Sequence, residues 1–90
     1  GDHVLRQHLG VAYGLIGDYA GAIDSFKQAI AINPTSTAFL KLAVTLEKAG
    51  DIPGAAGVLR QYLADPKGES PASVKAAEAE LVRLESSLKR

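Results

Sequence analysis

A pattern of small and large side chains, extending from Arg6 to Pro34, constrains this 90-residue chain more than its composition does. It consists of Arg6, the pair Leu9-Gly10, Tyr13, Ala22, Phe26 and Pro34. Glycine or alanine lets two helix backbones approach closely, and larger side chains then fill the flanks of the crossing. Small residues at these positions are compatible with two helices that cross closely, and the proline disfavours a helix in the residue before it.

The second half of the chain repeats the first. Gly50-Asp51 lies 33 residues after Gly17-Asp18, and Ala55 follows at the same distance from Ala22. The same offset pairs Phe26 with Leu59. An internal period of this size indicates stacked supersecondary units, each burying its apolar face against the next.

Breaks in the helical pattern divide the chain into five expected helices, at about residues 3–15, 19–32, 36–49, 52–64 and 71–89. Asp18 and Asp51 can cap the helices that follow them, and Thr35 or Ser36 can cap the third. Residues 65–69 form a polar loop, which we expect to be the least ordered stretch of the chain.

These residues resemble the tetratricopeptide repeat, whose pattern places Leu-Gly, Tyr, Ala, Phe and Pro at the same spacings. Arg6 departs from it, because the family usually has a bulky aromatic or aliphatic residue there. The resemblance implies an all-α helical-hairpin solenoid: two hairpins and a C-terminal capping helix. We expect one domain over residues 1–90, with repeats at about 3–35 and 36–67 and the capping helix at about 71–89.

The expected capping helix has one apolar stripe, formed by Val74, Ala77, Leu81, Leu84 and Leu88. A stack of repeats leaves its last hairpin with an uncovered face, which such an amphipathic helix would cover. The alternative is that the stripe pairs with a second copy of the chain as a coiled coil, which would be weak at this length.

The core is expected to combine small residues at the helix crossings with larger neighbours. The small residues are Gly10, Ala22, Ala43 and Ala55. The larger neighbours are Leu9, Tyr13, Phe26, Ile30, Leu42, Leu46, Leu59 and Leu63. We interpret all of them as residues of the fold and none as a binding residue.

The resemblance also implies where a partner would bind, because the first helix of each hairpin lines the concave face in this family. The corresponding residues are Val4, Gln7, His8, Val11, Leu15, Thr37, Leu40, Lys41, Val44 and Lys48. The family's carboxylate clamp for chaperone tails is absent, since Gln7 replaces its lysine and Val11 its asparagine.

The remaining surface is largely aliphatic, which favours an amphipathic or apolar segment of a partner protein. The resulting prediction is a non-catalytic interaction module, part of a larger scaffold. The alternative is a structural spacer or self-association module within a longer repeat protein, in which Val11, Leu40 and Val44 contact a neighbouring repeat or a second copy. The sequence leaves both open.

Catalytic and cofactor sites are not expected. The glycines at 10, 14, 17 and 21 precede no Gly-Lys-Ser/Thr, as a phosphate loop requires. His3 and His8 are five residues apart, whereas two metal ligands on one helix need a spacing of three or four. We therefore predict no enzyme activity, no metal and no cofactor.

Composition excludes further classes. Ten basic residues balance ten acidic ones, so a nucleic-acid partner is not expected. No apolar run approaches the roughly 20 residues of a membrane helix, and no signal peptide is visible. Cysteine is absent, which excludes disulfides but leaves the compartment open. The cytoplasm is slightly favoured and the periplasm stays open.

Overall fold

In a computed structural model, which describes residues 2–66 and 71–89, the chain is built from five helices, and the described residues contain no strand. They are α1 (Asp2–Leu15), α2 (Tyr19–Ile32), α3 (Ser36–Lys48), α4 (Ile52–Ala64) and α5 (Pro71–Leu88). The all-α prediction is confirmed, and each helix lies within one or two residues of its expected position. We expected residues 65–69 to be the least ordered stretch. Residues 67–69 of this loop lie outside the described residues, so this stays a prediction.

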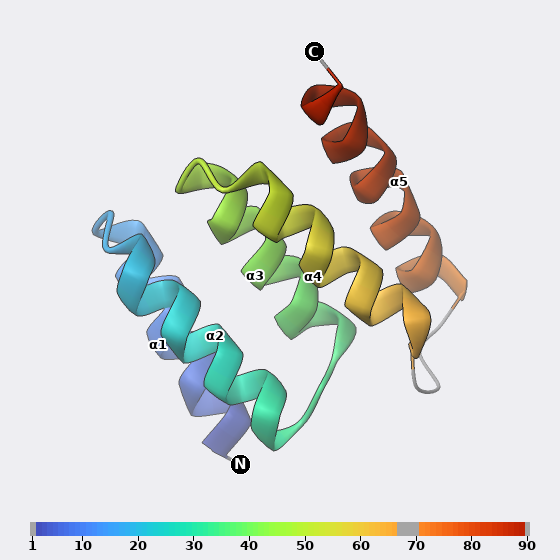
Figure 1. Cartoon of the computed structure of the whole chain (residues 1–90). Coiled ribbons are helices and arrows are strands. Elements are labelled where there is room, and N and C mark those ends of the chain that lie inside the picture. Colours follow the sequence, from blue (N-terminus) through green and yellow to red (C-terminus); the bar gives the residue numbers. More distant parts are fainter. Residues whose placement is uncertain (1, 67–70, 90) are drawn as a thin grey trace.

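Consecutive helices form antiparallel hairpins that stack side by side (Figure 1). The first hairpin is α1 and α2, the second is α3 and α4, and α5 lies along α4. In this view α2 and α4 lie in front of α1 and α3, so the two hairpins make two layers of helices. The molecule is accordingly thin, with principal extents of 34 × 30 × 17 Å.

The turn inside each hairpin has the same construction, which explains the repeated Gly-Asp pair. Gly17 and Gly50 have positive φ angles of 81° and 90°, a conformation that glycine adopts without steric cost. The aspartate that follows each glycine caps the next helix. Asp18 accepts a hydrogen bond from the Gly21 backbone N–H and Asp51 from that of Gly54, at 3.0 and 2.9 Å. Both caps were expected from the sequence.

The core runs through α2, α3, α4 and α5. Phe26, Leu59 and Leu84 are at most 2% exposed, and Ala22, Ala55 and Ala56 are fully buried. Phe39 of α3 and Tyr62 of α4 add an aromatic pair with ring centroids 5.5 Å apart. The remaining members are Ala29, Ala38, Leu42, Ala43, Leu46 and Ala77.

The prediction that Leu9 and Tyr13 are buried in the core is wrong. Leu9 is 39% exposed and Tyr13 is 37% exposed, because α1 packs against α2 and has no helix on its other side in the described residues. Tyr13 still contacts α2, since a Cβ added at Gly21 would lie 2.9 Å from its Cδ1. Arg6 lies on this edge helix and is partly exposed.

Ion pairs fix α5 on the second hairpin. The guanidinium of Arg83 donates two hydrogen bonds to the Glu47 carboxylate on α3, at 2.7 and 2.8 Å, and another to Glu80. Arg60 of α4 pairs with Glu85 at 2.9 Å. The hydrogen bonds from Arg83 lower the pKa of Glu47, and the two carboxylates raise the pKa of Arg83. These contacts set the orientation of α5 in addition to the burial of Leu84.

Candidate functional site

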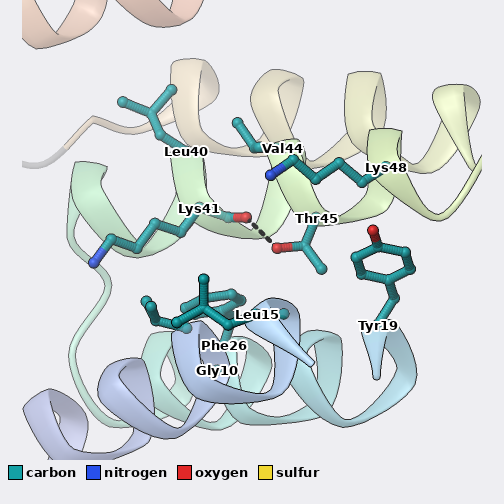
Figure 2. A pocket seen from close by; sticks show the side chains of 11 residues that line it. Gly10, Leu15, Tyr19, Phe26, Leu40, Lys41, Val44, Thr45 and Lys48 are labelled. Atoms are coloured by element: carbon teal, nitrogen blue, oxygen red, sulfur yellow. Dashed lines mark hydrogen bonds between the residues drawn. The ribbon is translucent and has the colours of Figure 1, made fainter. Parts of the chain in front are cut away.

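A groove of about 320 Å³ lies between α1 and α3 (Figure 2). Figure 2 shows α3 along one side of the groove and the first hairpin along the other. Its lining residues are Gly10, Val11, Gly14, Leu15, Tyr19, Phe26, Leu40, Lys41, Val44, Thr45 and Lys48. Most of these side chains are apolar, so the groove presents a hydrophobic surface with few polar groups.

The α1 side of the groove follows from two overlapping helical spacings. Val11 and Leu15 are four residues apart, which places them on one face, and they are 39% and 83% exposed. Gly10 and Gly14, also four apart, turn a strip without side chains toward the groove and α2. A Cβ on Gly10 would lie 2.6 Å from Cε1 of Phe26, so the glycine is what lets this ring approach α1. The buried Phe26 therefore backs the groove.

The α3 side carries Leu40, Val44 and Lys48 at four-residue intervals. Thr45 is only 8% exposed, and its hydroxyl donates a 2.8 Å hydrogen bond to the backbone carbonyl of Lys41. Because the hydroxyl bonds to its own helix, Thr45 turns its methyl group toward the opposite side of the groove (Figure 2). This wall is therefore more apolar than its sequence suggests.

The charged groups of the groove are both positive. Lys41 and Lys48 line it, and no aspartate or glutamate does. Tyr19, the first residue of α2, stands at the end near Lys48 and adds a phenol ring (Figure 2). The groove can bury apolar side chains and attract negative charge at its edge.

The structure brings together six of the ten residues expected on the concave face: Val11, Leu15, Leu40, Lys41, Val44 and Lys48. The other four, Val4, Gln7, His8 and Thr37, do not line this groove. They lie in the first half of α1 or the first turn of α3, toward the end of the helices away from Leu15 and Lys48. Whether any of the ten contacts a partner stays a prediction.

Five lining residues were not expected: Gly10, Gly14, Tyr19, Phe26 and Thr45. Gly10 and Phe26 had been assigned to the core, and they do belong to it. The groove reaches them because the Phe26 ring packs directly against the backbone of Gly10, so that both residues line it. The sequence contained a signal for this. Gly10 and Gly14 are four residues apart, beside Val11 and Leu15 at the same spacing, and this pattern indicates a helix face without side chains next to an apolar edge.

A second hollow, of about 310 Å³, lies at the other end of the hairpins. It is lined by Ile30, Pro34, Phe39, Gln61, Tyr62, Asp65 and Pro66. Two of its lining residues, Asp65 and Pro66, are the last described residues before position 67, and its surface is more evenly polar and apolar. We therefore treat the first groove as the candidate site.

Other kinds of site find no support in residues 2–66 and 71–89. No group of three or more histidines, cysteines or carboxylates is placed to hold a metal ion there. His3 instead lies 3.4 Å from the side-chain amide of Asn33, measured from Nε2 to Nδ2. None of the helices in this described part is long and apolar enough to cross a membrane.

Comparison with known families decides what the repeated hairpin is. A model of the tetratricopeptide repeat matches residues 17–81, well over half of the chain. The chain belongs to the tetratricopeptide-repeat family. Searches of curated proteins and of solved structures gave no match.

The matched stretch begins after α1 and continues through α2, α3 and α4 into α5. It thus supports the repeat reading of the sequence, while the α1 side of the groove lies outside it. Tetratricopeptide repeats are generally non-catalytic and mediate protein–protein interactions, so the family indicates a protein partner. The family leaves open which surface the partner contacts.

Proposed function

We propose that this tetratricopeptide-repeat domain binds a peptide or helix of a partner protein in the groove between α1 and α3, without catalysis, as part of a larger scaffold. The observation that carries the proposal is the exposed apolar lining. Val11 and Val44 are 39% and 43% exposed and lie on opposite sides of one groove. Exposed apolar side chains that converge on a concave surface are characteristic of binding sites.

The site is also rigidly supported. Phe26, which backs the groove, is 2% exposed and belongs to the core, and Thr45 is tied to its own helix. A preformed surface loses little conformational entropy on binding, so a modest buried area can give useful affinity. The predicted concave residues Val4, Gln7, His8 and Thr37 would extend this surface along α1 and α3.

The test is a selection of binders from a random peptide display library, followed by measurement with two charge-matched variants. Val11→Lys/Val44→Lys places two charges in the groove, and Ala79→Lys/Val82→Lys places them on the exposed outer face of α5. We expect selected peptides to lose at least about ten-fold in affinity for the groove variant and to keep it for the α5 variant. Circular dichroism verifies that both variants remain folded.

Equal binding of the selected peptides to the wild type and the groove variant would exclude the groove as the binding surface. The same conclusion would follow if the library yielded no binder for the wild type. Either result would leave the family assignment intact and would mean that a partner binds to another surface of the domain.

A second candidate function is self-association, and a separate observation favours it. On the edge helix, Leu5 is 58% exposed, and Ile16, just beyond the end of α1, is 78% exposed; neither lines the groove. Two such patches could meet in a dimer. Sedimentation equilibrium would show a mass that rises with concentration, and Leu5→Lys/Ile16→Lys would abolish the rise. A constant monomer mass would exclude this alternative.

A further inference from the structure

The groove concentrates positive charge in a chain that has no net charge. Ten basic and ten acidic residues balance overall, yet the groove is lined by Lys41 and Lys48 and by no carboxylate. Neither lysine forms an ion pair within residues 2–66 and 71–89, whereas Arg60 and Arg83 both do. The groove therefore offers two uncompensated ammonium groups to whatever occupies it.

The two lysines bracket an apolar centre. They are seven residues apart on α3, which separates their Cα atoms by about 10 Å along the helix axis. Val44 lies between them, and Leu15 faces them from the other side (Figure 2). In Figure 2 the Lys41 side chain extends toward one end of the groove, while the Lys48 side chain bends back toward Val44. In residue order along α3, the groove thus presents lysine, valine and lysine, with the Lys48 ammonium beside the valine.

On the basis of the proposed function, we propose that the partner segment is an acidic amphipathic helix that lies along α3. Two carboxylates seven residues apart would reach Lys41 and Lys48, and apolar side chains three and four residues after the first carboxylate would contact Val44 and Leu15. All four positions lie on one face of a helix, since seven residues make nearly two turns. A helix thereby matches both the charge and the apolar spacing of the groove.

The apolar centre argues against a polyanion as the occupant. A nucleic acid could neutralise both lysines, but its backbone would leave the valine and leucine side chains uncovered, and two lysines make a small basic patch. A purely apolar helix would bury those side chains but would leave the ammonium groups without counter-charge. Only a segment with both features is complementary to the whole groove.

Three alanine-rich peptides of about 16 residues, long enough to be helical, test the proposal. Each carries two adjacent leucines and differs only in the two flanking residues, which are glutamate, glutamine or lysine at the spacing given above. Affinities are measured by calorimetry at low and at high salt. We expect the glutamate peptide to bind about ten-fold more tightly than the glutamine peptide at low salt, with the lysine peptide weakest. High salt should reduce this difference.

A matched pair of variants assigns the effect to the two lysines. Lys41→Gln/Lys48→Gln should bring the glutamate peptide down to the affinity of the glutamine peptide. Lys75→Gln/Lys89→Gln removes the same charge from two exposed positions, one on α5 and one just after it, and should leave the ranking unchanged. Both variants alter only exposed or half-exposed side chains, so their fold is expected to persist.

The outcomes separate this inference from the proposed function. If the glutamine peptide binds as tightly as the glutamate peptide, and Val11→Lys/Val44→Lys weakens both, the groove binds peptides but does not select acidic ones. Absence of binding by all three peptides overturns the acidic-helix inference, and the display selection decides independently on the groove. If Lys41→Gln/Lys48→Gln instead changes the sedimentation mass, a second copy of the chain is the occupant and the inference is wrong.

Discussion

Gly10 of α1 and Phe26 of α2 are in such close contact that any side chain at position 10 would overlap the ring. An added Cβ would lie 2.6 to 2.8 Å from three of its carbons, and the ring is 2% exposed, which leaves it little room to move. This contact is one of those that join α1 to α2, and it also forms the back of the groove. It therefore links the stability of the fold to the shape of the candidate site.

Gly10→Ala should lower the free energy of unfolding by about 1–3 kcal/mol, because overpacking outweighs the gain in helix propensity. Gly57→Ala in α4 is the control, since an added Cβ there meets nothing within 4 Å. That change should stabilise the domain by up to about 1 kcal/mol. Urea denaturation measures both. A Gly10→Ala variant as stable as the wild type would mean that the ring is free to shift.

Leu59→Ala should be among the most damaging single changes. The side chain is fully buried in the core, so its truncation removes apolar contacts and leaves a cavity. We expect a loss of about 2–5 kcal/mol in the free energy of unfolding. Val82→Ala on the exposed face of α5 should change it by less than about 0.5 kcal/mol. Comparable losses for the two variants would contradict the position of the core.

Gly50→Ala tests the turn of the second hairpin. Gly50 has a φ of 90°, and the backbone N–H of the next residue, Asp51, donates a 2.8 Å hydrogen bond to the carbonyl of Leu46. Alanine in this conformation should cost about 1–2 kcal/mol. Gly50→Asn should cost less, because asparagine tolerates positive φ better. Thermal unfolding would rank the three proteins, and an alanine variant equal to the wild type would show that the turn can adopt another conformation.

The Glu47–Arg83 pair should make stability depend on pH. Because the hydrogen bonds from Arg83 lower the pKa of Glu47 below 4.5 in the folded state, the folded protein holds this proton less tightly than the unfolded chain. The stabilisation is therefore complete above pH 4.5 and is lost as the pH falls through the lowered pKa.

Urea denaturation between about pH 6 and pH 3 would measure this dependence. Arg83→Gln should reduce the loss of stability on acidification, since Glu47 then lacks its partner. Arg60→Gln removes a different ion pair of α5 and should leave the contribution of Glu47 in place. An identical pH profile for the wild type and Arg83→Gln would show that the pair does not form in solution.

The helices and their turns could be predicted because their signals are local. Gly17-Asp18 and Gly50-Asp51 each combine a helix end and a helix cap in two adjacent residues, and the structure has both where the sequence placed them. The repeat at a 33-residue offset predicted that two similar units stack against each other. The family match over residues 17–81 agrees with this reading.

What the sequence could not supply was which side of α1 would be covered. Leu9 and Tyr13 on α1 have the same apolar character as Leu42 and Leu46 on α3, but α1 packs mainly against α2, whereas α3 packs against α2, α4 and α5. Likewise, the resemblance to the tetratricopeptide repeat implied that Val11 and Val44 share one face, but it gave no depth to the groove. Its depth comes from Phe26, a residue of α2 that reaches the groove only because Gly10 has no side chain.

The position of Tyr19 at the end of the groove gives the protein an intrinsic optical reporter. The chain has no tryptophan and three tyrosines, so its ultraviolet emission comes from tyrosine alone. Tyr62 is 2% exposed in the core, whereas the partly exposed Tyr19 lines the groove. Occupation of the groove would change the surroundings of that phenol directly. In a Tyr19→Phe variant, the change in tyrosine emission on binding should be lost. Binding to this domain can thus be followed without attaching a dye to either molecule.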